Sequence, residues 1–129
     1  MPRAKQLTVS APDRPGLMGE LASALGAKKV NIRAFHAWAM EGRGIIRLVV
    51  DKHAAAKKEL SARGWETTED EILMVTLTDS PGTLGKLGAK LGKAGVNVRY
   101  AYVGMAGSAR KANVYLGVPD IKAALKAAR

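Results

Sequence analysis

The sequence predicts an α+β fold made of two tandem ferredoxin-like βαββαβ units. An offset of 66 residues lays residues 13–16 on 79–82, both Asp-x-Pro-Gly, and residues 30–33 on 96–99, both Val-Asn-x-Arg. In each copy, strand-like alternation is followed by helical spacing and then by two further extended stretches. This ordered recurrence indicates an internal duplication.

Each copy has the length of a small domain rather than of a solenoid repeat. We therefore predict a first domain at residues 1–69 and a second at residues 70–129. The two share one pattern, and each element of the first before its final strand has a counterpart in the second.

The first strand of each unit is predicted from apolar residues at every second position. The Asp-x-Pro-Gly segment then predicts a helix start, because Asp can cap a helix, Pro suits its first turn and Gly permits close approach. Apolar residues at helical spacing predict a helix with one buried stripe. These apolar positions are Leu7, Val9, Ala11, Met18, Leu21 and Leu25 in the first unit, and Leu73, Val75, Leu77, Leu84, Leu87 and Leu91 in the second.

Extended chain is expected again at residues 31–40 and 97–105, and each stretch reaches a glycine-bearing turn. Hairpin partners follow at 45–51 and 112–118, and second helices at 53–63 and 120–128. A fourth strand at 65–68 completes the first unit, whereas the second is expected to lack its final strand because the sequence stops at Arg129. Right-handed crossovers give the strand order 4-1-3-2, with both helices on one face.

The missing strand predicts an uncovered edge along residues 72–78 of the second unit. An apolar edge of this kind favours pairing. We expect it to be covered by a strand of the first unit or by a second chain in a homodimer, and we favour the homodimer.

The loop before each first helix predicts an anion site, because the first amides of a helix lack intrahelical acceptors and its dipole is positive there. A carboxylate fits such a site. Asn31 or Asn97, entering the second strand, is expected at the same end of the unit, where its side-chain carbonyl could accept from an ammonium. The pair would suit a free α-amino acid, and the alternative is a tight turn with no ligand.

These loops, the Val-Asn-Ile and Val-Asn-Val entries to the second strand and the run at residues 97–102 resemble the ACT domain, a ligand-sensing module of amino-acid-metabolism enzymes, here as a stand-alone tandem. The resemblance covers nearly the whole chain. It implies paired units and a small ligand, usually an amino acid, held where the loop meets a neighbouring unit. The residues it implies for ligand binding are Asp13, Arg14, Pro15, Gly16, Leu17, Asn31 and Ile32, with Asp79, Ser80, Pro81, Gly82, Thr83, Asn97 and Val98.

Composition narrows the function. The chain has no Cys and two His, so thiolate catalysis, disulfides and cysteine-type zinc sites are excluded, and no residue set supports an active site. We predict a non-enzymatic amino-acid-binding regulatory protein without cofactor or metal, acting on a separate enzyme or regulator. Trp38, Tyr100 and Tyr102 are expected either to pack or to wall an apolar pocket.

The alternative is a basic ferredoxin-like nucleic-acid-binding protein that uses the open sheet face. The formal net charge is +10, but Lys and Arg are spread along the whole sequence and there is one Phe. Any nucleic-acid binding is therefore expected to be non-specific and salt-dependent. The beginning of the sequence lacks an apolar leader and no run suits a membrane span, which predicts a cytoplasmic protein.

Overall fold

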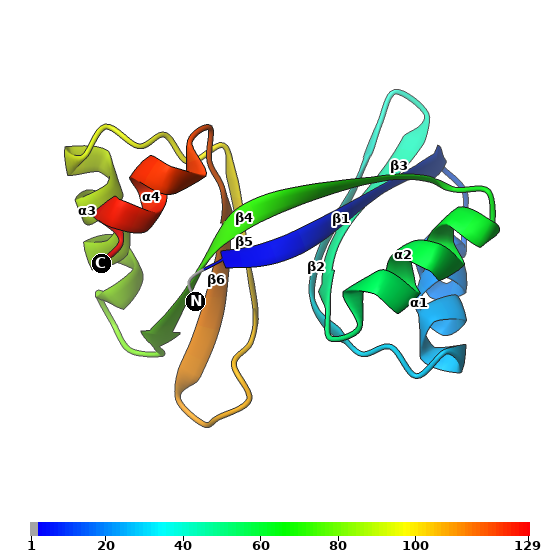
Figure 1. Cartoon of the computed structure of the whole chain (residues 1–129), viewed down its shortest axis with the longest axis horizontal. Coiled ribbons are helices and arrows are strands. Elements are labelled where there is room, and N and C mark those ends of the chain that lie inside the picture. The colour runs from blue at the N-terminus through cyan, green and yellow to red at the C-terminus, as the bar shows by residue number, and fades with distance from the viewer. Residues whose placement is uncertain (1–2) are drawn as a thin grey trace. The chain divides into compact units, whose positions relative to one another are not determined.

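The computed structural model describes residues 3–129 and confirms the α+β fold (Figure 1). Six strands follow the order β2-β3-β1-β4-β6-β5 in the sheet, so the first four strands have the predicted order 4-1-3-2. The elements in chain order are β1 (Arg3–Pro12), α1 (Leu17–Ala27), β2 (Ile32–Met40), β3 (Arg43–Val50), α2 (His53–Ala62), β4 (Glu66–Thr78), α3 (Thr83–Lys93), β5 (Tyr100–Met105), β6 (Lys111–Gly117) and α4 (Ile121–Ala127).

The chain divides into two compact units, which we call the first unit (residues 5–70) and the second unit (residues 3–4 with 71–129). The division falls inside β4. The sequence predicted two separate strands here, at 65–68 and from 72 onward, but one strand runs from Glu66 to Thr78. The charged residues between the two apolar stretches hid this continuity, since they stand exposed within the strand.

The second unit contains the start of β1, the part of β4 from Glu71 on, β6 and β5. Arg3 Nη1 lies 3.2 Å from Glu71 Oε2, which pairs the start of β1 with β4. In the sheet, β4 therefore has β1 on one side and β6 on the other. This contact reaches β4 at Glu71, before the predicted edge at residues 72–78, so the covering of that edge by the first unit or by a second chain stays a prediction.

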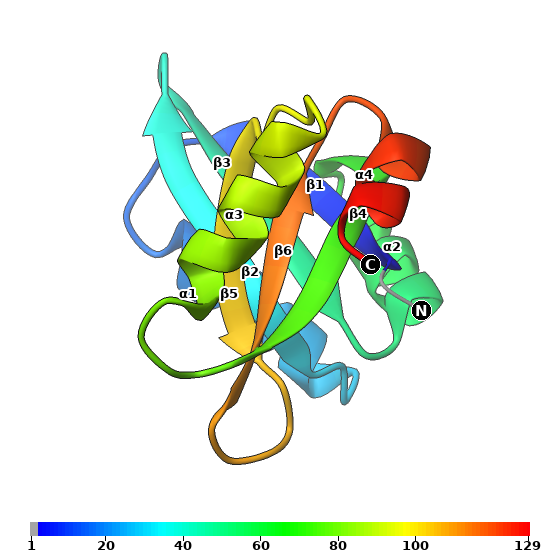
Figure 2. The same cartoon turned by 90° about the vertical axis from the view of Figure 1, so that its left-hand side faces the viewer.

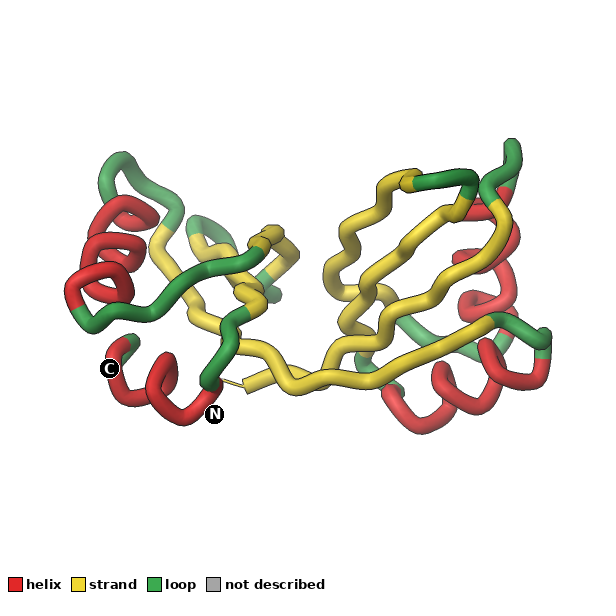
Figure 3. Tube along the Cα trace, turned by 90° about the horizontal axis from the view of Figure 1, so that it is seen from above, coloured by secondary structure: helices red, strands yellow, loops and turns green. Residues whose placement is uncertain are grey.

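The core of the first unit lies between its sheet and the helices α1 and α2, which gather on one face of its strands (Figure 3). Pairing of Leu7 with Leu48 and of Val9 with Ile46 puts the alternating apolar residues of β1 and β3 on this face. Trp65 closes the core from the edge beside β4. The alternation read from the sequence therefore identifies the buried face correctly.

Helix α1 begins later than the sequence predicted. Its N-cap is Gly16, with φ of 86°, and no side chain caps it, so Asp13 does not have the expected capping role. At the other end Lys29 adopts φ of 58° and the Val30 amide donates to Leu25 O at 3.0 Å. This left-handed residue with its returning hydrogen bond is a common way to end a helix.

The second unit repeats this plan, with α3 and α4 lying in front of β4, β5 and β6 in Figure 2. Its core combines Leu73 of β4 with Leu87 and Leu91 of α3 and with Val114 and Leu116 of β6. Strand β5 starts at Tyr100 rather than at Asn97, and residues 96–99 are irregular.

One apolar position of each first helix departs from the predicted stripe. Met18 in α1 is 51% exposed and Leu84, its counterpart in α3, is 58% exposed. Periodicity placed both in the core, but they stand beside the buried face at the start of the helix. Of the positions that periodicity predicted, the buried ones therefore begin one turn later, at Leu21 in α1 and at Leu87 in α3.

Candidate functional site

The loop between β1 and α1 presents backbone donors at the helix start. Leu17 N donates to Arg14 O at 3.3 Å and Glu20 N donates to Gly16 O at 2.9 Å. The amides of Met18 and Gly19 are the other donors of this first turn, and no backbone acceptor is found for them in residues 3–129. Together with the positive end of the helix dipole they favour an anion.

A cavity of about 360 Å³ opens at these amides, between the start of α1 and the edge strand β2. This volume lies in the range of small-ligand sites. The loop and the first turn of α1 form one side of the cavity, and β2 and β3 form the other. We call it the α1 cavity, and its lining residues are Asp13, Arg14, Gly16, Leu17, Met18, Gly19, Ala37, Trp38, Ala39, Gly44 and Ile46.

Small side chains on the two strands leave this space open. Ala37 pairs with Ile46 and Ala39 pairs with Gly44, so the two alanines and the glycine share the helix face of the sheet. A Cβ at Gly44 would lie 2.7 Å from Leu17 Cδ2, so a larger residue there would have to displace the end of the Leu17 side chain. The cavity therefore lies where the side chains of β2 and β3 are small, beside the buried side chain of Leu17.

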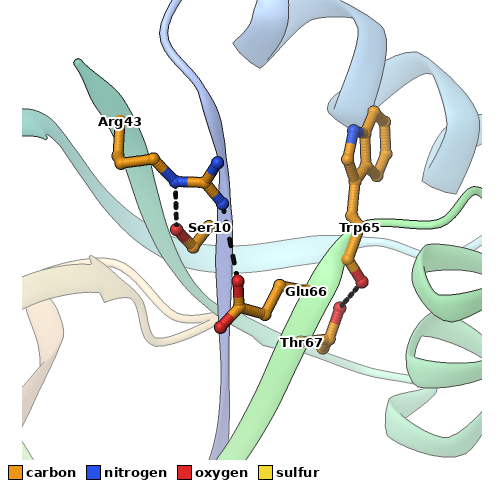
Figure 4. Close-up of polar contacts among 5 residues, drawn as sticks. All are labelled: Ser10, Arg43, Trp65, Glu66 and Thr67. Carbon is orange, nitrogen blue, oxygen red and sulfur yellow. Dashed lines mark hydrogen bonds and ion pairs between the residues drawn. The ribbon is translucent and has the colours of Figure 1, made fainter.

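The start of β3, which carries Gly44, is fixed by polar contacts on the opposite sheet face (Figure 4). Arg43 Nε donates to Ser10 Oγ at 3.1 Å, and Arg43 Nη2 lies 3.5 Å from Glu66 Oε2. Figure 4 shows the indole of Trp65 on the other side of the strands, toward the helices. Contacts of β3 with β1 and β4 thus fix the strand backbone beside this end of the α1 cavity.

Charges of both signs stand at the cavity. Asp13 and Arg14 both line it, and the Arg14 guanidinium forms an ion pair with Glu20 one turn into α1. An arginine has five N–H donors, so this pairing leaves donors for a second acceptor. A carboxylate beside a guanidinium and free amides is a suitable arrangement for a zwitterion. Among residues 3–129, no basic side chain forms an ion pair with Asp13.

The structure does not bring Asn31 to the loop, and the expectation that they share one end of the unit was wrong. Pro12 pairs with Arg43, whereas Ile32 pairs with Val50 at the far end of β3. Seven residue steps along a strand separate these ends by about 23 Å. The second strand runs parallel to the first, so its start lies where the first strand begins.

Asn31 has a structural contact instead. Its backbone amide donates to Asp51 Oδ1 at 2.8 Å, and the Asp51 amide donates to Asn31 O at 3.1 Å. The hydrogen bond from Asn31 lowers the pKa of the Asp51 carboxyl. Ile32 packs against the core of the first unit. The contacts between Asn31 and Asp51 thus join the start of β2 to the end of β3, at the end of the hairpin away from its turn.

The loop of the second unit repeats the backbone of the first but not its side chains. Gly82 has φ of 90°, and Thr83 Oγ1 donates to Thr78 O at 2.8 Å and to Ser80 O at 3.0 Å. The Asp79 amide donates to Arg110 O, and Pro81, like Pro15 in the first loop, is exposed. Thr83 therefore uses its hydroxyl for hydrogen bonds within its own loop. Its counterpart in the first unit, Leu17, packs in the core instead.

Asn97 and Val98 are also distant from their loop. Thr78 pairs with Lys111, while Tyr100 pairs with Gly117 at the other end of β6. Six residue steps make this separation about 20 Å. Both residues lie in the irregular segment before β5, and the geometry of the two units agrees on this point.

The strand positions that open the α1 cavity carry larger side chains in the second unit. The pairing places Val103 at the position of Ala37, Met105 at that of Ala39 and Ala112 at that of Gly44. Val103 is 58% exposed and Met105 is 80% exposed. Duplication thus preserved the loop while the facing strand diverged.

Sequence reasoning missed most of the strand side of this site. Of the lining residues, it named the loop and offered Trp38 either as packing or as a pocket wall. The Trp38 ring lies with Arg47 on the sheet face opposite Ala37 and Ala39, and the guanidinium carbon of Arg47 is 4.7 Å from the ring centroid. Tyr102, by contrast, stacks on Tyr115 at 5.4 Å between centroids. The signal that could have found the rest was the loss of side-chain volume at Ala37 and Ala39 relative to the second copy.

The described residues contain no group of three or more His, Asp or Glu side chains placed to hold a metal ion. Within the same part of the chain, none of the helices has the length and apolar character needed to span a membrane.

Residues 5–62 match the ACT domain model. No curated protein sequence matches the chain. Among solved structures, a protein of Bacteroides thetaiotaomicron is similar at 22% identity and a TM-score of 0.88, over 98% of this chain and 86% of that one. The ligand-free regulatory subunit of aspartate kinase from Thermus thermophilus is similar at 18% identity and a TM-score of 0.68, over 98% and 89%. The corresponding subunit from Thermus flavus is similar at 17% identity and 0.68, over 99% and 91%.

Proposed function

Because this chain has an ACT domain at residues 5–62, we propose that it is a non-enzymatic regulatory protein that binds a free α-amino acid in the α1 cavity. The observation that carries the proposal is the cavity itself. It joins unpaired helix amides, a guanidinium and a carboxylate to an apolar wall within one space of about 360 Å³.

The polar groups of the cavity suit the two charges of the ligand. The ligand carboxylate would accept from the amides of Met18 and Gly19 and from Arg14, since charge-assisted hydrogen bonds to a carboxylate are strong. The ammonium would donate to Asp13. This assignment replaces Asn31 and Asn97, which lie about 20 Å or more from their loops by strand geometry.

The second loop is a weaker candidate for the same ligand. Ser80 stands where the first loop has Arg14. Val103 and Met105 occupy the positions of Ala37 and Ala39, so larger side chains face the loop of the second unit. We propose that the first unit holds the ligand and that the second unit serves the regulated partner or the pairing of chains.

Regulation follows if the bound form differs in its affinity for a partner, because a ligand shifts an equilibrium only through such a difference. The fold neighbours support a partner that is an enzyme, since they include a regulatory subunit of aspartate kinase and the alpha and beta subunits of aspartokinase. A separate enzyme or regulator, a homodimer and a cytoplasmic location belong to this proposal.

The proposal is tested by isothermal titration calorimetry of the full chain with each of the twenty amino acids, beside thermal unfolding. At about 100 times Kd a ligand stabilises the bound unit by about 2.7 kcal/mol. For a unit of this size the midpoint of unfolding then rises by about 10 °C or more. Absence of heat and of any thermal shift for all twenty amino acids would contradict the proposal.

We predict that giving the first unit the side chains of the second removes binding. The double variant Ala37→Val with Ala39→Met fills the α1 cavity and is expected to weaken amino-acid binding at least tenfold. Both alanines are exposed, so the free energy of unfolding should change little. The matched control is Val103→Ala with Met105→Ala, which should leave the affinity unchanged. Equal affinities of both double variants and the wild type would place the ligand elsewhere.

A further inference from the structure

A second cavity, of about 210 Å³, continues along α1 from the first. The two share Met18, Gly19 and Ile46, so the second begins where the proposed main-chain contacts end. We call it the apolar trough. Besides the shared residues it is lined by Leu21, Ala22, Phe35 and Leu48.

All residues of the trough are apolar, in contrast to the loop end of the α1 cavity. A hydroxyl, amide or charge placed there would leave water without finding a hydrogen-bond partner, which is unfavourable. An aliphatic, thioether or aromatic side chain would instead lose only its contact with water. The trough therefore favours a ligand whose side chain, where it extends from the loop into the trough, is apolar.

Two large side chains at the rim of the trough are half exposed. Met18 and Phe35 each have 51% of their surface accessible, although they face each other across α1 and β2 around the same space. The bulge between Ile32 and Ala34 turns Phe35 to the helix face, opposite Leu48. A ligand side chain in the trough would cover both, which explains exposed apolar surface at this place better than core packing does.

Resting on the proposed function, we infer that the ligand is an amino acid with a large apolar side chain, of the leucine, methionine or phenylalanine kind. Its main chain lies at Met18 and Gly19, and its side chain follows α1 through one turn toward Ala22. One methylene in an apolar pocket changes affinity by about 10-fold to 200-fold. Leucine is therefore expected to bind at least tenfold more tightly than alanine.

The test is calorimetric titration of the full chain with leucine, methionine and phenylalanine, set against alanine, serine, aspartate and lysine. The expected result is binding of the first three at least ten times tighter than of any of the other four. Serine, aspartate or lysine binding as tightly as leucine would overturn the inference while leaving the proposed function intact. No binding of any amino acid would overturn both.

A matched pair of variants locates the side chain. Ala22→Leu fills the trough from α1 and should reduce the affinity for leucine to that for alanine, because only the main-chain contacts then remain. Gly88→Leu is the counterpart in α3, where a Cβ has no atom within 4 Å, and it should leave both affinities unchanged. Unfolding midpoints of both variants show that the chain remains folded. Unaltered preference for leucine in Ala22→Leu would contradict the placement.

Discussion

Replacing Leu25 by alanine is expected to destabilise the first unit by about 2–5 kcal/mol, since a fully buried leucine leaves both lost transfer free energy and a cavity. Leu25 has no exposed surface and packs between α1 and the sheet. Its carbonyl also accepts from the amides that end the helix, at Lys28 and Val30. Urea unfolding followed by circular dichroism measures the change.

Met18→Ala is the control on the same helix. Met18 is half exposed and belongs to the cavity wall, so its truncation should change the free energy of unfolding by less than about 1 kcal/mol. Binding of leucine should weaken in this variant, because one wall of the trough is removed. Equal loss of stability in both variants would show that the stripe predicted by periodicity is buried along its whole length.

Replacing Gly16 by valine is expected to abolish amino-acid binding without unfolding the chain. Gly16 has φ of 86°, a conformation that a β-branched residue strongly disfavours. No atom lies within 4 Å of the added Cβ, so the effect is backbone strain rather than a clash. The loop would relieve about 1–2 kcal/mol of strain by moving its amides away from the α1 cavity. Calorimetric titration with leucine measures the loss of binding.

Gly82→Val is the matched control, because Gly82 has φ of 90° and is equally open. The two variants should lose similar stability in urea, whereas leucine binding should disappear only in Gly16→Val. Loss of binding in Gly82→Val alone would assign the ligand to the second unit, and retention in both would remove the loop from the site.

The duplicated pattern predicted the fold well because it repeats physical constraints. Alternation at Leu7 and Val9 and again at Leu73 and Val75 predicts strands with one buried face, and the structure buries that face in the core of each unit. Helical spacing identified Leu21 and the other buried leucines of the first helices. The strand order then followed from the handedness of the crossovers.

The candidate site was predicted only on its loop side. The position of Asn31 was misjudged because the central places of the first and third strands were taken to bring the loop and the start of the second strand to one end of the unit. A parallel crossover instead returns the chain to the opposite end of the sheet. Met18 was assigned to the core because periodicity cannot separate an apolar residue that packs from one that lines a cavity. Ala37 and Ala39 escaped notice because a cavity is made by missing volume, and small residues carry no pattern of their own.

The most direct measurement is a titration of the isotope-labelled chain with leucine, followed by amide chemical shifts in nuclear magnetic resonance spectra. Binding in the α1 cavity predicts saturable shifts of the amides of Gly16, Met18 and Gly19, together with those of Ala37 and Ala39 across the cavity. The amides of residues 82–85 in the second loop provide the internal comparison and should remain in place. Shifts confined to residues 82–85 or to the surroundings of Asn31, or no shift at saturating leucine, would contradict the proposed site.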